Sequence, residues 1–279
     1  MITRVVNKMS RLLGKLPDLD ASHTAVPYLN AVLDQLLRSD RRVPVRSNYA
    51  WGMLQTAFLA SSLKIDRISV IEFGVAGGNG LLAMEHIAAW LGKHFNIRID
   101  VYGFDGGAGL PPPVDWRDLP NLWPAGGYPM DEKKLRARLG RAELIVGMVE
   151  QTVEDFLASG PAPVGFISFD LDQYTSTTHA FKVLEADPRL LMPRIHCYFD
   201  DILGFTCGDH NGERLAISEF NETHAYRPVS QIYGLRFCLP RKLREANWTE
   251  KMFMTHVVEH PLYNQWDGML RRASLALAA

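Results

Sequence analysis

The chain has 279 residues, 47% of them hydrophobic and 22% charged, and its 30 basic and 31 acidic residues leave a formal net charge of -1 at pH 7. This composition is typical of a globular protein with a buried core, and the balanced charge excludes a bulk positive field that would bind nucleic acid or an anionic membrane. Three cysteines without a CxxC spacing exclude a cysteine-built zinc site, and the absence of a long apolar run excludes a transmembrane span, so we expect a reducing, cytoplasmic location.

Helical spacing of apolar residues characterises the start of the chain, from 5 to 16 among basic residues and again from 29 to 59. Residues 5–16 fit either a targeting or membrane-surface helix or a helix that packs on the body or on a second subunit. We favour packing, because no cleavage-like site follows. Residues 1–65 are therefore predicted to form a helical extension that makes a homo-oligomer plausible, and residues 66–279 to form one domain.

Short β-rich runs then alternate with helical segments. Strands are predicted over residues 68–73, 97–104, 143–146, 164–169 and 195–199. Helices are predicted over residues 81–91, 131–139, 153–157, 178–184 and 214–220. This alternation indicates an α/β fold, a mostly parallel sheet with helices on both faces. Two later apolar runs, 232–239 and 252–258, are candidates for strands that close the sheet.

A glycine-rich turn, Glu72-Phe-Gly-Val-Ala-Gly-Gly-Asn-Gly80, follows the first predicted strand. Glycines let a backbone turn tightly beside a ligand, but the second glycine of the dinucleotide pattern GxGxxG is missing. The carboxylate of Glu72 suits a cationic ligand better than a phosphate. The pattern E-x-G-x-x-x-G resembles motif I of class I S-adenosylmethionine-dependent methyltransferases, and Asp105 at the next strand end is suited to ribose hydroxyls. The resemblance implies cofactor contacts from Glu72, Phe73, Gly74, Gly78 and Asp105. The alternative is a strand–helix turn with two incidental acids.

Four acids follow the fourth and fifth predicted strands: Asp170 and Asp172 after one, Asp200 and Asp201 after the other. Adjacent parallel strands would bring them to one rim of the sheet. Like charges so close disfavour each other's ionisation unless a cation is bound, and oxygen-only ligands select Mg²⁺ or Ca²⁺. The alternative of helix capping accounts for Asp172 or Asp201 but not for all four.

These motifs, together with Gly109-Leu-Pro111 and the stretch 212–220, resemble in content and order the macrocin O-methyltransferase (TylF-like) family over about residues 70–220. The resemblance implies a Rossmann-like class I methyltransferase fold. It also implies transfer of a methyl group from S-adenosylmethionine, with Mg²⁺ assistance, to a sugar hydroxyl, usually in a natural-product glycoside. The metal ligands it implies are Asp170, Asp200 and Asp201. Asp172 is the candidate general base; we expect its alternatives, His179, His196 and His210, to be structural or exposed.

Twelve of the 27 residues from 103 to 129 are glycine or proline. Such a segment forms no ordinary helix or interior strand. We predict a lid over the cofactor crevice whose aromatic residues, Trp116, Trp123 and Tyr128, contact the acceptor, with residues 47–51 as another wall. The alternative is a rigid surface loop packed by its own aromatic residues.

Two other functions remain open on the residues alone. Asp170-Leu171-Asp172 after an apolar strand also resembles the DxD metal motif of nucleotide-sugar glycosyltransferases. However, Glu72 is unsuited to a diphosphate, and Asp200-Asp201 would be unexplained. A non-enzymatic assembly module is disfavoured by the intact acids. We therefore predict an enzyme that methylates a small hydroxylated acceptor.

Overall fold

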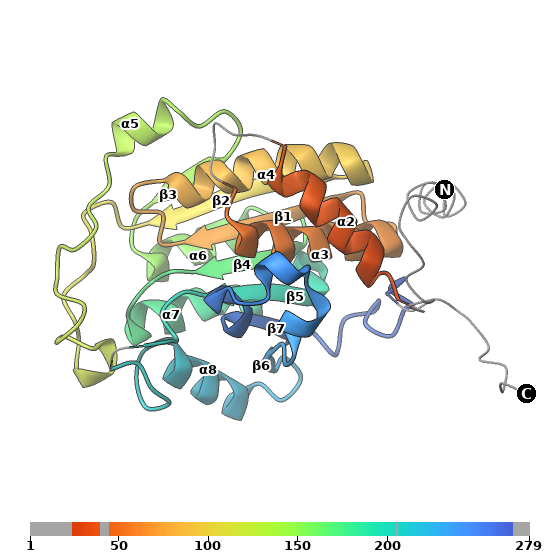
Figure 1. The fold of residues 1–279 in the computed structure, drawn as a ribbon. Helices are drawn as coiled ribbons and strands as arrows, with labels where there is room; N and C mark the ends of the chain where they lie inside the picture. Colours follow the sequence, from red (N-terminus) through yellow and green to blue (C-terminus); the bar gives the residue numbers. More distant parts are fainter. Residues whose placement is uncertain (1–23, 40–44, 205, 270–279) are drawn as a thin grey trace, which may run out of the picture.

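A seven-stranded sheet forms the centre of the computed structural model, which describes residues 24–39, 45–204 and 206–269 (Figure 1). Its strand order is β3-β2-β1-β4-β5-β7-β6. The strands are β1 (Arg67–Phe73), β2 (Arg98–Asp105), β3 (Glu143–Val146), β4 (Val164–Phe169), β5 (Leu191–Phe199), β6 (Val229–Gln231) and β7 (Met252–His256). The first five strands are parallel, while β7 runs antiparallel to both β5 and β6. The predicted α/β fold with a mostly parallel sheet is confirmed.

Helices cover both faces of this sheet (Figure 1). One face carries α2 (Val26–Leu37), α3 (Ser47–Leu63) and α4 (Asn79–Phe95). The other carries α6 (Val149–Ala158), α7 (Tyr174–Ala180) and α8 (Gly212–Thr223), while the short α5 (Glu132–Arg136) lies near β3 and α4. Alternate residues of the strands point to opposite faces, so each strand contributes to both layers of the core. None of the helices in the described ranges is long and apolar enough to cross a lipid bilayer.

The helix α3 is buried almost throughout, from Asn48 to Ala60, and it packs on β4, β5 and α4. It therefore shares one core with the sheet, although it precedes the first strand in the chain. The division of the chain at residue 65 stays a prediction. The predicted helix over residues 5–16 lies outside the described residues.

One predicted strand is wrong. The run 232–239 does not join the sheet; β6 comes just before it, and Leu235–Cys238 forms a 3₁₀ turn. Gly234, at φ +72°, breaks the extended backbone at the start of that turn. Leu235 and Leu239 are buried and pack on the core, whereas Tyr233 and Phe237 of the same run are 84% and 75% exposed, so only part of this apolar run is explained by packing and none of it by strand pairing. The other run contains β7, which extends the sheet as predicted.

The order of the strands in the sheet indicates where a ligand crevice lies. From β1 the chain adds β2 and β3 on one side, and then β4 and β5 on the other. Ligands of open parallel sheets bind at such a reversal, beyond the carboxyl ends of the strands. The segments that follow β1, β2, β4 and β5 therefore meet at one rim.

Candidate active site

A cavity of about 350 Å³ opens at this rim. Its wall is built from the glycine turn between β1 and α4, the end of β2, the loop that follows β2 and the segments after β4 and β5. Of the residues predicted as functional, the wall includes Glu72, Gly74, Gly78, Asp105, Asp170, Asp172, Asp200 and Asp201. One cavity therefore unites the proposed cofactor residues with the four acids.

The glycine turn is packed so closely that side chains are excluded at two positions. Gly74 has φ +84°, and a Cβ there would lie 1.7 Å from the main-chain oxygen of Asp170. At Gly80 a Cβ would lie 1.8 Å from the Glu72 Oε1 atom. Glycine at these positions lets β1 approach β4 and lets the first turn of α4 lie against the carboxylate of Glu72.

Glu72 is a buried carboxylate, with only 1% of its surface exposed. Its Oε1 atom accepts a hydrogen bond of 2.7 Å from the hydroxyl of Tyr49. Its Oε2 atom has no partner among the described residues. Burial raises the pKa of Glu72 to about 8, and the Tyr49 hydrogen bond and the charge of Arg46 only partly oppose this rise. A buried, half-satisfied carboxylate of this kind favours a cationic partner.

The segment 47–51 was predicted as a wall of the site, but the wall instead includes Arg46, which precedes it. Tyr49 is fully buried and reaches Glu72 from α3. Sequence reasoning assigned no role to Arg46 and missed the link from Tyr49 to Glu72, because the two residues are brought together only by the packing of α3 on the sheet.

Asp105 ties the glycine turn to the end of β2. Its Oδ2 atom accepts hydrogen bonds from the N–H groups of Val75 and Ala76, at 2.9 and 2.8 Å, and its Oδ1 atom accepts one from Gly107 at 2.6 Å. A carboxylate oxygen has two lone-pair positions, so Oδ1 keeps one for a ligand hydroxyl.

Phe73, predicted as a cofactor contact, lies in the core. Its ring is fully buried, 4.9 Å from the ring of Phe104 and 5.6 Å from that of Phe169. Its main-chain carbonyl accepts the N–H of Asp170 at 3.0 Å and so joins the ends of β1 and β4.

Three of the acids form a compact group. Asp170, Asp200 and Asp201 each offer a carboxylate oxygen, and these oxygens lie within 4.8 Å of one another. Burial and the neighbouring carboxylates raise the pKa of Asp170 to about 7 and that of Asp201 to about 8. Asp172 stands beside them: its N–H donates to Asp201 Oδ2 at 3.2 Å, and burial and the charges of its neighbours raise its pKa to about 7. Without a cation, the cluster is strained electrostatically.

Side chains from distant parts of the chain hold this cluster in place. Glu213, fully buried on α8, accepts the N–H of Asp201 at 2.9 Å, and its second oxygen has no partner among the described residues. Asp200 Oδ1 accepts hydrogen bonds from the Tyr198 hydroxyl at 2.5 Å and from the ammonium of Lys251 at 3.1 Å. Glu213 lies in the stretch 212–220 that carries the family resemblance, but no role was assigned to it, and the sequence contained no local signal for Lys251; they lie 12 and 51 residues from the acids that they contact.

The three histidines occupy different environments. His179 lines the cavity, and its Nδ1 atom lies 3.0 Å from a carboxylate oxygen of Glu150. His196 is buried within β5 against Trp51, and desolvation lowers its pKa to about 3. His210 is exposed. His196 and His210 are therefore structural and exposed, respectively, as expected.

Trp123 and Tyr128 of the loop after β2 line the cavity, although 59% of the surface of Tyr128 is exposed, whereas Trp116, 63% exposed, is not part of the wall. The Nε1 atom of Trp123 is buried without a hydrogen-bond partner among the described residues. Two of the three predicted aromatic residues thus face the site.

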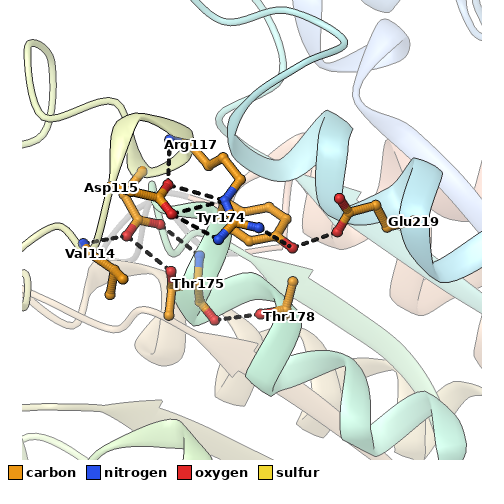
Figure 2. A network of polar contacts seen from close by, with 8 residues as sticks. Val114, Asp115, Arg117, Tyr174, Thr175, Thr178 and Glu219 are labelled. Carbon is orange, nitrogen blue, oxygen red and sulfur yellow. Dashed lines mark hydrogen bonds and ion pairs between the residues drawn. The ribbon is translucent and has the colours of Figure 1, made fainter.

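This loop is fastened to α7 and α8 by a polar network (Figure 2). Asp118, fully buried, accepts the N–H and the hydroxyl of Thr175 at 2.7 and 3.0 Å, at the start of α7. Arg117 lies over the ring of Tyr174, 4.5 Å from its centroid, and the Tyr174 hydroxyl donates to Glu219 at 2.5 Å. The loop is therefore held against the helix that directly follows Asp170 and Asp172.

No family model and no curated protein matches the sequence. Among solved structures, the chain is similar to CalS11, a calicheamicin methyltransferase, with 18% identity and a TM-score of 0.51 over 86% of this chain and 94% of that one. It is also similar to the O-methyltransferase NovP, with 14% identity and a TM-score of 0.50 over 83% of this chain and 98% of that one. The predicted Rossmann-like fold of class I methyltransferases is confirmed.

Proposed function

We propose that the chain is an S-adenosylmethionine-dependent O-methyltransferase that uses Mg²⁺, or another hard divalent cation, to methylate a hydroxyl of a small molecule, a sugar or a natural-product glycoside. The observation that carries the proposal is that one cavity joins a buried, half-satisfied carboxylate to a cluster of three others. Two of the solved structures to which the chain is similar are described as a calicheamicin methyltransferase and an O-methyltransferase. A cytoplasmic location, a homo-oligomer and a place in natural-product biosynthesis stay predictions.

The cofactor residues fit a cationic ligand. S-adenosylmethionine carries a sulfonium and an ammonium group, and Glu72 offers an unpartnered oxygen in a place where a carboxylate needs a positive charge. Gly74 and Gly78 both have positive φ angles, which keep the turn open beside the cavity. Asp105 retains an acceptor position for a ribose hydroxyl.

The acid cluster fits a hard cation. Its donor set consists of carboxylate oxygens alone, the ligands that Mg²⁺ prefers. Asp170, Asp200 and Asp201 would hold the ion, and their mutual repulsion, which raises the pKa values of Asp170 and Asp201, would be relieved. A bound divalent cation would orient an acceptor hydroxyl and lower its pKa.

The chain's own residues would then handle the proton and the solvent. Asp172 lines the cavity beside the cluster, where its carboxylate would accept the proton of the acceptor hydroxyl. Trp123 lines the same space and would help to exclude water from the reacting groups.

The glycosyltransferase alternative is disfavoured by charge. The cavity wall carries seven carboxylates and, among the described lysines and arginines, only Arg46. A nucleoside diphosphate would meet Glu72 in the turn where a phosphate-binding site presents N–H groups alone.

Calorimetry separates the two functions. We expect S-adenosylhomocysteine to bind with or without Mg²⁺, and a nucleoside diphosphate sugar not to bind in the cofactor site. Absence of S-adenosylhomocysteine binding would refute the proposed function. An Asp200→Asn variant should lose Mg²⁺ binding, whereas Asp209→Asn, at an exposed position in the next loop, should retain it.

A further inference from the structure

Glu213 is a buried carboxylate of which only one oxygen is satisfied by the protein. None of its surface is exposed. It is the second residue of α8, and its Oε2 atom accepts the N–H of Asp201 at 2.9 Å. Its Oε1 atom has no hydrogen-bond partner among the described residues. A buried oxygen without a donor costs free energy, so a ligand that supplies the donor is expected at this position.

The hydrogen bond to Asp201 connects Glu213 to the rest of the acid cluster. Asp201 is one of the three acids whose oxygens lie within 4.8 Å of one another. Its Oδ2 atom accepts the N–H of Asp172 at 3.2 Å. Asp172 has a φ of +62°, a left-handed conformation that costs free energy for a residue other than glycine. Glu213 therefore fixes the main chain of Asp201, and Asp201 in turn holds the candidate base in its conformation.

The two basic side chains near Glu213 are engaged elsewhere. The ammonium of Lys251 donates to Asp200, and Arg214, the next residue of α8, pairs with Asp209. Glu213 does not line the cavity, so it approaches the acids from inside the protein and not from the acceptor space. A cation held by the clustered acids would supply the positive charge that the Glu213 carboxylate lacks.

Hard divalent cations bring water into such a site. Mg²⁺ dehydrates reluctantly and usually keeps several waters when carboxylates bind it. A water on a cation directs its protons outward, so its partner in the protein must be a hydrogen-bond acceptor. The free oxygen of Glu213 is such an acceptor. Outer hydrogen-bond partners of this kind orient the ligands of a metal and tune its affinity.

We propose that Glu213 is a positioning residue of the metal site. One of its oxygens fixes the main chain of Asp201, and the other accepts a hydrogen bond from a water on the bound cation. This inference rests on the proposed function and extends the metal site to α8. Glu219, on the same helix, accepts the hydroxyl proton of Tyr174 in the loop network, so α8 contacts both the acids and the loop after β2 (Figure 2).

Two substitutions separate the two hydrogen bonds of Glu213. Glutamine has nearly the shape of glutamate, but its amide presents an acceptor at one position and a donor at the other. Glu213→Gln can therefore keep the bond from the Asp201 N–H or the bond from the water, but not both. Glu213→Met keeps neither. Loss of an outer partner typically weakens metal binding 10- to 100-fold, so we expect about 10-fold for Glu213→Gln and about 100-fold for Glu213→Met.

Mn²⁺ is the probe, because it also prefers oxygen ligands and its free concentration can be read by electron paramagnetic resonance. The full chain and its variants are titrated with Mn²⁺, and Mg²⁺ is then added as a competitor. Calorimetry with S-adenosylhomocysteine should give the wild-type affinity in each variant, since Glu213 does not line the cavity. Glu222→Gln, at an exposed position of the same helix, is the matched control and should bind Mn²⁺ as the wild type does.

The outcomes separate this inference from the proposed function. Wild-type Mn²⁺ affinity in Glu213→Gln would overturn the hydrogen bond to the water, and this variant suffices if Glu213→Met does not fold. Parallel loss of Mn²⁺ and S-adenosylhomocysteine binding would also overturn the inference, because Glu213 would then only stabilise the fold. A wild type that binds S-adenosylhomocysteine but not Mn²⁺ would remove the metal and this inference together. One that binds Mn²⁺ but not S-adenosylhomocysteine would refute the methyltransferase alone.

Discussion

Glu72→Gln should make the ligand-free protein more stable at neutral pH while weakening cofactor binding. Glu72 is 1% exposed, and burial raises its pKa from 4.5 to about 8. The folded state therefore holds the proton more tightly than the unfolded state. The contribution of Glu72 to the free energy of unfolding is therefore largest below pH 4.5. It declines as the pH rises towards 8, because the carboxyl group ionises more readily in the unfolded state.

The size of the effect follows from the two pKa values. Their difference corresponds to about 5 kcal/mol of free energy of unfolding when fully expressed. Between pH 5 and pH 8, about 3 kcal/mol of it should be lost from the wild type. Glutamine has nearly the same shape and does not titrate, and its Oε1 atom still accepts the Tyr49 hydroxyl proton.

Thermal unfolding of both proteins in EDTA, at pH 5, 6, 7 and 8, measures the difference. The Tm of the variant should rise relative to the wild type by roughly 6 °C over this range. Addition of S-adenosylhomocysteine should then stabilise the wild type more than the variant. A Tm difference that does not change with pH would refute the assignment of Glu72 as a buried acid with a raised pKa.

Three further predictions concern the rest of the site. Asp200→Asn should abolish Mg²⁺-stimulated methyl transfer and leave S-adenosylhomocysteine affinity intact, because Asp200 belongs to the acid cluster and not to the glycine turn; loss of cofactor binding in calorimetry would contradict this. Gly80→Ala should weaken S-adenosylhomocysteine binding, since its Cβ would lie 1.8 Å from Glu72 Oε1, whereas Gly208→Ala, where a Cβ meets nothing within 4 Å and the residue does not line the cavity, serves as the control. Equal binding by both variants would show the contact to be unimportant. Asp118→Asn should lower the free energy of unfolding by about 2 kcal/mol, because an amide nitrogen cannot accept the Thr175 donors. It should also raise the acceptor KM by loosening the loop, and Asp155→Asn, at an exposed acid of α6 outside this network, is its control. An unchanged KM would mean that the loop does not hold the acceptor.

Strand positions were largely predictable. Runs of apolar β-branched and aromatic residues marked the first five strands to within a few residues. The main differences are at β5, which begins at Leu191, and at residues 232–239, where a 3₁₀ turn buries Leu235 and Leu239 but leaves Tyr233 and Phe237 exposed. A short apolar run therefore does not by itself distinguish a strand from a turn that buries only some of its apolar side chains.

The convergence of the acids was also predictable. Asp170, Asp172, Asp200 and Asp201 directly follow two strands, and neighbouring parallel strands end at the same rim. The partners of these acids were not predictable. Glu213 and Lys251 contact them from α8 and from the segment before β7; the stretch 212–220 was recognised as a motif, but its sequence did not show that Glu213 meets Asp201.

The conformation of the loop after β2 was likewise predictable only in part. Its glycines and prolines exclude helix and interior strand, and this much follows from the backbone of each residue alone. Its path over the cavity depends on Asp118, whose carboxylate meets Thr175, 57 residues later in the chain.

The sequence by itself determined the α/β alternation, the glycine turn after β1 and the acids at the strand ends, because each depends on the conformation of a few consecutive residues. Only the tertiary structure decided that Tyr49 meets Glu72, that Glu213 supports Asp201 and that Phe73 lies in the core. A buried polar group is satisfied by whichever element packs against it. Which element supplies the hydrogen-bond partner depends on the arrangement of the whole fold.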